Sequence, residues 1–238
     1  RAEVRAWLEA NATPKRGRDD KFGAGLDEAA YLAAARAWQA RKAAAGYAAI
    51  AAPREMGGLG GTPAMQVIYG QEESRFLTPG LVFEVSLGTA LPTVAMWGTA
   101  EQKAAYLAPA FRGDHIWCQL FSEPSAGSDL GNVRMRAVRD GDGWIVTGQK
   151  VWTSGAHFAD YGILLARTDW DQPKSKGLTM FILDMKLPGI EVRPIRQISE
   201  ESHFNEVFLS EVRLPDSARL GPEGQGWIKR RVVAALTF

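Results

Sequence analysis

Cysteine and histidine are both scarce in this chain. Its 238 residues include one cysteine, Cys118, and three histidines, His115, His157 and His203. A lone cysteine excludes an internal disulfide and suits a reducing compartment such as the cytoplasm. No two histidines have the spacing of metal ligands on one helix, so each is expected at the surface or in a local hydrogen bond.

The chain also lacks a charge surplus and a long apolar run. The 28 basic residues are matched by 27 acidic ones, which argues against a nucleic-acid partner. No apolar run approaches the roughly 20 residues that a membrane-spanning helix needs. We therefore expect no nucleic-acid partner and no membrane span. The length allows one large domain or two smaller ones, with a sizeable core.

Sequence signatures of several enzyme classes are missing as well. The glycines of Gly57–Gly61 fail the G-x-G-x-x-G pattern, because position 63 is proline and the segment does not follow a strand. No serine lies in a G-x-S-x-G pattern. Cys118 lies near His115, but without a third orienting group a packed strand cysteine is the better interpretation. A dinucleotide-binding or hydrolase fold therefore has little support.

Helical patterns dominate the first half of the chain. Apolar residues recur at helical spacing, and hydroxyl or carboxylate caps precede several of these runs. Thr62-Pro63 places a cap before a first-turn proline, and Thr99 and Gln102 have capping-box spacing. Helices are predicted around 4–8, after Asp27, from Pro63 to about Phe76, and from Thr99 to near Gly113.

From about Trp117 the pattern changes to strands. Asp140-Gly-Asp-Gly143 is a strong hairpin signal between two of them. The predicted strands are Trp117–Ser122, Val133–Arg139, Trp144–Lys150, Tyr161–Arg167, Leu178–Asp184 and Glu206–Arg213.

This order of elements predicts an α+β fold. An N-terminal all-helical domain is expected over 1–115, and a middle β-barrel or sandwich domain over 116–222. The truncated start of a C-terminal helical bundle is expected over 223–238. A helical pattern begins near Gln225 and reaches Phe238 without a capping glycine, so we expect the chain to be a fragment.

Two short segments carry the functional signal. Phe121–Asp129 and Gln149–Ala156 each follow a strand-like run and are rich in small or hydroxyl-bearing residues. Trp152 can supply a broad apolar face, and the backbone near Phe121 together with nearby hydroxyls can supply hydrogen bonds. The pair predicts a pocket for a flat ring with polar edges, such as a flavin.

Each of these residues also has an ordinary structural interpretation. Trp152, one of eight tryptophans, is by itself more typical of a core. Thr153 and Ser154 are typical of a solvent-facing strand edge. Ser128 and Asp129 are typical of a turn that they cap themselves.

Six motifs, in order along nearly the whole chain, resemble the acyl-CoA dehydrogenase family. The signature turn of that family usually begins with threonine and often has glycine at its fourth position, where this chain has Ser122 and Ser125. The motifs are Gly57–Gly61, Gly98–Lys103, Ser122–Asp129, Asp142–Ser154, Val212–Asp216 and Gly221–Trp227.

The resemblance implies that FAD is the cofactor. By this match Trp152 packs beside the ring and Ser154 donates to the nitrogen that accepts hydride. Ser128 would lie where flavin and thioester substrate meet, and would bind substrate. Family members often have threonine at the position of Ser154. The implied flavin-contacting residues are Gln119, Leu120, Phe121, Ser122, Gly127, Ser128, Trp152, Thr153 and Ser154.

The reaction implied by the family is α,β-dehydrogenation of an acyl-CoA thioester. A carboxylate takes the α proton, the flavin takes hydride from the β carbon, and electrons pass to an electron-transfer flavoprotein. The family's base is a glutamate of its C-terminal helical domain, so no catalytic residue is assigned in this chain, Glu123 and Glu206 included. The family also implies a homotetramer or a heteromer.

Two alternatives remain open at this stage. The protein could be an acyl-CoA oxidase or a flavin monooxygenase built on the same scaffold. It could also be a non-catalytic partner subunit of a heteromeric dehydrogenase. Peroxide formation in air distinguishes the first alternative, and the residue at the base position distinguishes the second.

Overall fold

The computed structural model describes residues 1–17, 19–80, 82–198, 200 and 202–227. The chain forms two compact units. The first consists of residues 1–84 and 104–114, and the second of residues 85–103 and the chain from 115 onward.

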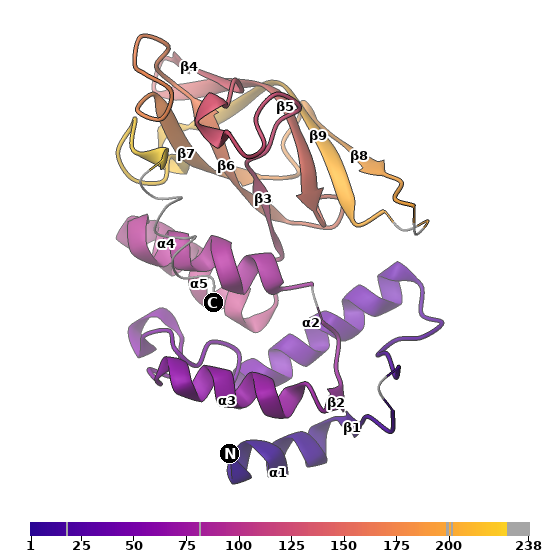
Figure 1. Cartoon of the computed structure of the whole chain (residues 1–238). Helices are drawn as coiled ribbons and strands as arrows, with labels where there is room; N and C mark the ends of the chain where they lie inside the picture. The colour runs from indigo at the N-terminus through magenta and orange to yellow at the C-terminus, as the bar shows by residue number, and fades with distance from the viewer. Residues whose placement is uncertain (18, 81, 199, 201, 228–238) are drawn as a thin grey trace. The chain divides into compact units, whose positions relative to one another are not determined.

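The first unit is helical, as predicted (Figure 1). Its helices begin and end close to the expected positions. They are α1 (Ala2–Asn11), α2 (Glu28–Ala44), the short 3₁₀ turn η1 (Arg54–Met56), α3 (Pro63–Glu73) and most of α5 (Ala100–Arg112), and the two-residue strands β1 (Thr13–Pro14) and β2 (Phe76–Leu77) pair antiparallel.

The predicted helix caps are confirmed. The side chain of Asp27 accepts a hydrogen bond from the backbone three residues on at the start of α2, and Thr62 does the same before Pro63 in α3. Before α5, the Thr99 hydroxyl accepts from the Gln102 N–H at 3.2 Å, and the Gln102 side chain accepts from the Thr99 N–H at 3.0 Å. This reciprocal pair is a capping box, which explains why α5 begins there.

The glycine-rich loop that follows η1 is shaped by close packing. A Cβ atom at Gly58 would lie 2.1 Å from the carbonyl oxygen of Ala52, so only glycine fits there. Gly60 donates to the same carbonyl at 2.8 Å, and Gly61 donates to the carbonyl of Ile50. The loop thus folds back on its own chain, in agreement with the failed nucleotide-loop pattern.

Aromatic rings and one buried carboxylate hold the helices of the first unit together. Trp7 contacts Tyr47 with ring centroids 5.0 Å apart, and Tyr47 stacks on Tyr69. Glu72 of α3 is 2% exposed and accepts hydrogen bonds from Arg5 of α1 at 2.9 and 3.2 Å. Together with Arg1 and Arg75, these bonds lower the pKa of Glu72 to about 2. The carboxylate therefore ties α1 to α3.

The second unit opens with a helical stretch that the sequence did not predict. It comprises a π-helix, η2 (Ser86–Ala90), and α4 (Leu91–Trp97). Pro92 lies in the first turn of α4, where proline is accepted. The buried hydroxyl of Ser86 accepts from the backbone of Trp117 at 2.9 Å and so holds the start of the first large strand.

A curled mixed sheet makes up the rest of the second unit (Figure 1). Its strand order is β3-β6-β4-β5-β9-β8, with β7 paired to β6. β6 runs parallel to β3 and β4, and the other pairs are antiparallel. The strands are β3 (Trp117–Leu120), β4 (Arg136–Asp140), β5 (Gly143–Ser154), β6 (Tyr161–Arg167), β7 (Leu178–Asp184), β8 (Ile190–Ile195) and β9 (Phe204–Pro215).

The predicted α+β class is confirmed, with the middle part forming an incompletely closed barrel. β6 and β7 have the predicted bounds, and Asp140 pairs with Gly143 across the predicted hairpin. β5 runs four residues farther than expected, to Ser154. β8 was missed because it contains Pro194 and its side chains are only partly buried, as is typical of an edge strand.

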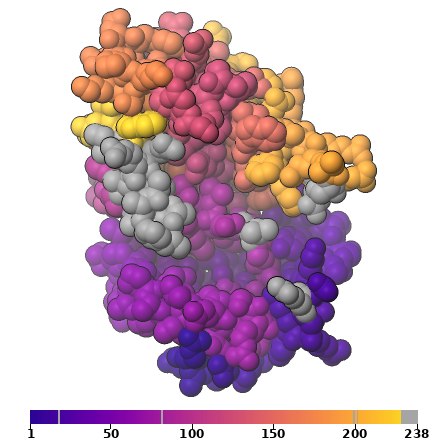
Figure 2. Space-filling view, viewed as in Figure 1, coloured from indigo at the N-terminus to yellow at the C-terminus, as the bar shows by residue number. Residues whose placement is uncertain are grey.

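The core of the second unit lies between β6, β7 and the strands around them. Nearly every residue of β6 and β7 is buried. The indole of Trp144 meets the ring of Phe181 edge-on, with centroids 5.4 Å apart. By contrast, the pink-to-red segment of the chain, which includes the turn after β3, reaches the surface on the face shown in Figure 2.

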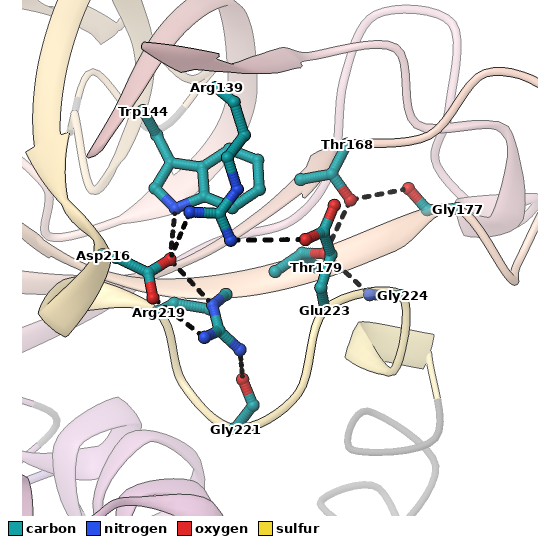
Figure 3. Close-up of polar contacts among 10 residues, drawn as sticks. All are labelled: Arg139, Trp144, Thr168, Gly177, Thr179, Asp216, Arg219, Gly221, Glu223 and Gly224. Carbon is teal, nitrogen blue, oxygen red and sulfur yellow. Dashed lines mark hydrogen bonds and ion pairs between the residues drawn. The ribbon is translucent and has the colours of Figure 1, made fainter. Parts of the chain in front are cut away.

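A polar cluster anchors the chain where it leaves β9 (Figure 3). Asp216 accepts from the indole N–H of Trp144 at 2.8 Å and from the guanidinium of Arg219 at 2.9 and 3.0 Å. Arg139 lies 4.3 Å above the Trp144 ring and forms an ion pair with Asp216. Arg219, with help from Trp144 and Arg139, holds the pKa of Asp216 well below its usual range.

Beyond this cluster the backbone is tied to β7. The N–H of Gly224 donates to the hydroxyl of Thr179 at 2.9 Å, and Leu220 donates to the carbonyl of Met180 (Figure 3 shows the former). The helix predicted from 225 onward falls mostly outside the described residues. The predicted domain boundaries at 115 and 222 therefore stay predictions.

Candidate functional site

The two segments singled out in the sequence lie side by side in the second unit. The N–H of Val151 donates to the carbonyl of Ser122 at 2.9 Å. One residue earlier, the ammonium of Lys150 donates to the carbonyl of Phe121 at 3.0 Å. The residues after β3 and the last third of β5 therefore form adjoining walls, as the sequence predicted.

Trp152 occupies a β-bulge in β5. Lys150 pairs with Val207 and Thr153 with Asn205, so two residues of β5 oppose one residue of β9. The backbone φ of Trp152 is +60°, which costs a bulky residue about 1–3 kcal/mol. Its indole is 59% exposed. The core interpretation of Trp152 is therefore wrong, because the bulge turns its ring outward.

Side chains beyond the bulge alternate between the two faces of β5. Trp152 and Ser154 are exposed on one face, whereas Thr153 is 1% exposed on the other. The Asn205 amide donates to the carbonyl of Thr153 at 3.0 Å and fixes this end of the strand. Within the described part of the chain, the buried Thr153 hydroxyl has no hydrogen-bond partner. Trp152 and Ser154 can thus act together on a ligand, while Thr153 faces inward.

The signature segment is a tight turn. Glu123 and Ala126 exchange two backbone hydrogen bonds, each 3.0 Å long, around Pro124 and Ser125. Proline at the second position of a turn presets the backbone angle that the turn needs. The turn leaves Gly127 and Ser128 exposed. Before it, Gln119 is half-buried and Leu120 and Phe121 are buried.

Three hydroxyls of the two segments are uncommitted. Those of Ser122, Ser128 and Ser154 make no hydrogen bond to any residue that the structure describes. Ser122 is half-buried, and the other two are exposed. Trp152, on the same face of β5 as Ser154, is exposed as well. The two segments thus present an apolar face and free hydroxyls, which together suit a flat ring with polar edges.

A buried ion pair lies behind this surface. The carboxylate of Glu123 accepts from Lys150 at 2.8 Å, and from the backbone of Arg134 at 2.7 Å and Met135 at 2.9 Å. Lys150 is fully buried and Glu123 is 6% exposed. Burial lowers the pKa of Lys150 to about 8, although the charge of Glu123 opposes this shift. The signature turn is therefore fastened to β5 and to the chain that leads into β4.

No role for Lys150 was predicted from the sequence. A signal was nonetheless present, because Lys150 shares the strand parity of Trp144 and Val146, which face the core. A lysine at a core-facing position requires a carboxylate or carbonyl partner. The partner could not be identified without the fold, since Glu123 lies 27 residues earlier in the chain.

Arg167 fixes the loop that follows the signature turn. Its guanidinium donates to the carbonyls of Gly131 at 2.9 Å, Val133 at 3.0 Å and Lys174 at 2.7 Å. Burial lowers the pKa of Arg167, against the attraction of Glu123. Backbone carbonyls thus hold this cation, and the loop from 129 to 135 is fixed from two sides.

Other candidate chemistries are not supported. Cys118 is fully buried in β3, burial raises its thiol pKa to about 12, and its sulfur lies 3.9 Å from that of Met185. It is the packed strand cysteine that the sequence predicted. The described residues contain no group of three or more histidine, cysteine or carboxylate side chains placed to hold a metal ion. No helix among them is both long and apolar enough to cross a membrane.

Family models match both parts of the chain. Residues 1–114 match the model described as acyl-CoA dehydrogenase, N-terminal domain, and residues 118–212 match that of acyl-CoA dehydrogenase, middle domain. The second match contains the signature turn and the Trp152 bulge.

Curated relatives agree with these models. Acyl-CoA dehydrogenase FadE34 of Mycobacterium tuberculosis is 48% identical over 180 residues, which is 75% of this chain and 25% of FadE34. Acyl-CoA dehydrogenase IpdE1 of the same organism is 37% identical over 238 residues, which is all of this chain and 61% of IpdE1. The chain thus spans between a quarter and about three fifths of these two relatives.

Solved structures show the same fold. The ChsE4-ChsE5 complex from Mycobacterium tuberculosis matches with a TM-score of 0.82 and 30% identity, over 99% of this chain and 59% of that one. A second structure, described as the Tcur3481-Tcur3483 steroid ACAD, matches with a TM-score of 0.76 and 29% identity, over 99% and 61% of the two chains.

Proposed function

Because this chain belongs to the acyl-CoA dehydrogenase family, we propose that the full-length protein binds FAD and oxidises the Cα–Cβ bond of an acyl-CoA thioester. The observation that carries this proposal is the exposed Trp152 on the same face of β5 as the uncommitted hydroxyl of Ser154, with the free hydroxyls of Ser122 and Ser128 on the adjoining segment. The ring of Phe204 meets this indole edge-on, with centroids 6.0 Å apart, yet Trp152 stays mostly exposed on a strained bulge. A ring stacked against it would give the strained conformation a role.

The residues present fit the isoalloxazine of FAD. Trp152 offers the apolar face on which a ring system can pack, and Ser154 lies on the same face of β5 to donate to its edge. Gly127 and Ser128, exposed after the signature turn, would contact the ring from the other segment. The remaining implied contacts are those of Gln119 to Ser122 and of Thr153. They would use mainly backbone groups, because Leu120, Phe121 and the side chain of Thr153 are buried.

FAD would supply the acceptor for the hydride that leaves the β carbon. The side chains of this chain would orient and stabilise the reacting groups. Ser154 would donate a hydrogen bond to the edge of the ring that gains electron density, an interaction that strengthens as the reaction proceeds. Ser128 would lie at the junction of ring and thioester and would bind the substrate. Trp152 would hold the ring in place against Ser154 and Ser128.

Neither glutamate considered in the sequence is suited to be the base. Both oxygens of Glu123 are occupied, by Lys150 and by the N–H groups of Arg134 and Met135. Glu206 accepts from the amide of Gln149 at 2.8 Å. We therefore assign the base to neither of them, and expect it on the C-terminal helical domain of the full-length protein.

We propose an acyl-CoA substrate, an electron-transfer flavoprotein as electron acceptor and an oligomeric state that is either a homotetramer or a heteromer. One solved relative is a ChsE4-ChsE5 complex, and the steroid ACAD among the solved relatives is named for Tcur3481 and Tcur3483 together. These relatives support the heteromer as an alternative to the homotetramer.

The test uses the full-length protein with and without oxygen. After anaerobic loading with FAD, an acyl-CoA that is a substrate should bleach the flavin, and an artificial electron acceptor should restore the colour. Little peroxide should form in air. Rapid peroxide formation would favour an acyl-CoA oxidase, and FAD binding without bleaching by any acyl-CoA would favour a non-catalytic partner subunit.

A further inference from the structure

Lys150 joins the two segments of the proposed flavin site from behind. Its ammonium donates to the carbonyl of Phe121 and to the carboxylate of Glu123, the two residues on either side of Ser122. Two residues farther along β5 lies Trp152. We propose that Lys150 is a positioning residue, which fixes the Ser122 turn relative to the Trp152 bulge and thereby sets the width of the flavin site. This inference rests on the proposed FAD site.

After β3 the backbone passes from its pairing with β6 to contacts with β5. The pairing of β3 with β6 ends at Leu120, opposite Leu164. The next two carbonyls accept hydrogen bonds from β5, that of Phe121 from Lys150 and that of Ser122 from the N–H of Val151. Beyond the last pair with β6, the position of this segment is thus set by β5, and one of the two bonds comes from a side chain.

A buried ion pair such as that of Lys150 and Glu123 is a poor choice for stability alone. Desolvation of two charges usually offsets their attraction, and an apolar pair of the same volume is often as stable. Lys150 is fully buried, and its side chain has three donors for two described acceptors. The particular contribution of Lys150 is a hydrogen bond of fixed direction to the Phe121 carbonyl. An apolar residue could fill the same space but could not hold the Phe121 carbonyl.

Both sides of the proposed site depend on the contacts of the Lys150 ammonium. On one side, Glu123 also accepts from the backbone of Arg134 and Met135, so the position of the whole signature turn follows the carboxylate. On the other side, Lys150 is the last residue paired with β9 before the bulge. A shift of the ammonium would therefore move the Ser122 and Trp152 walls relative to each other.

The test is the double variant Glu123→Gln/Lys150→Met in the full-length protein. It removes both charges of the pair at once, and the buried Arg167 keeps its three backbone carbonyls, so the fold should persist. The control is Ile182→Ala, which opens a cavity in the core at β7, a strand that pairs with β6 and with neither of the two segments. Apo-protein is titrated with FAD, and visible circular dichroism of the bound flavin and the melting temperature are recorded for all three proteins.

The double variant should bind FAD about tenfold more weakly or worse, as expected when one directional hydrogen bond no longer positions a site. Its bound flavin should also give an altered visible circular dichroism spectrum. Ile182→Ala should melt at a lower temperature but bind FAD with the affinity and spectrum of the wild type. Wild-type affinity and spectrum in the double variant would overturn the inference.

If the double variant does not fold, Glu123→Gln/Lys150→Gln replaces it and is judged by the same two outcomes. The shorter amide is neutral and polar, and it does not reach the Phe121 carbonyl as lysine does. A wild-type protein that binds no FAD would instead contradict the proposed function. The two failures are therefore distinguishable.

Discussion

Lys150 and Glu123 form an ion pair 2.8 Å long inside the β unit, with side-chain exposures of 0% and 5%. Removing only one partner leaves a buried charge without compensation. Lys150→Met should therefore lower the free energy of unfolding by about 3–5 kcal/mol, and adding Glu123→Gln should restore much of the loss. Chemical denaturation measures both.

The matched control is an exposed ion pair in the same sheet, between Arg213 and Asp140. Arg213→Met should change the free energy of unfolding by no more than about 1 kcal/mol. An equal loss in Arg213→Met and Lys150→Met would show that burial of the Lys150 pair has no energetic importance.

The depressed pKa of Lys150 predicts a stability change at alkaline pH. Its folded pKa is about 8, whereas an unfolded lysine titrates near 10.4. Between these values the unfolded chain binds more protons, so the wild type should gain stability relative to Glu123→Gln/Lys150→Met as the pH rises. Glu123 and Arg167 are the charged groups near this site. Unfolding curves from pH 7 to 10.5 measure the difference, and a fall over that range would contradict the assigned direction.

The lowered pKa of Glu72 predicts a stability change at acidic pH. Hydrogen bonds from Arg5, Arg1 and Arg75 lower its pKa to about 2, against about 4.3 for an unfolded glutamate. Its contribution is complete above the unfolded pKa and is lost as the pH falls towards 2. The stability advantage of wild type over Glu72→Gln should be constant near neutral pH and shrink below about pH 4.5. An advantage that stays constant down to pH 2.5 would show that Glu72 is not held ionised by these arginines.

Ser154→Ala should slow flavin reduction more than it weakens substrate binding. A hydrogen bond of this kind contributes roughly 0.5–1.5 kcal/mol, or more in a dry site. The rate should therefore fall by roughly threefold to more than tenfold. Stopped-flow bleaching with an acyl-CoA substrate measures the rate of flavin reduction. The control is Ser210→Ala, which replaces an exposed serine of β9. Equal rates in the two variants would leave Ser154 as an ordinary strand serine.

Local patterns predicted much of the fold. The capping pair Thr99 and Gln102 and the hairpin at Asp140–Gly143 are signals within a few residues, and both appear where expected. The edge strand with Pro194 was missed because its burial is weak and its pairing with β9 is non-local. The contact of the two functional segments was expected from their composition, since both combine hydroxyls with a nearby strand end.

The strained bulge and the buried ion pair could not be predicted. The positive φ of Trp152 depends on the register between β5 and β9, which no short pattern encodes. The partner of Lys150 comes from 27 residues away, on a turn whose position is set by the fold. Both features bear on the proposed site, where local propensity and global structure are expected to disagree.

The most direct measurement of the central claim is the FAD content of the purified full-length protein and of two tryptophan variants. Trp152 and Trp170 are 59% and 55% exposed, so their loss perturbs the surface similarly. The wild type and Trp170→Ala should each release close to one FAD per chain on denaturation, and Trp152→Ala should release clearly less. A wild type that carries no FAD and cannot be reconstituted, or equal FAD content in Trp152→Ala and Trp170→Ala, would contradict the claim that this surface binds the flavin.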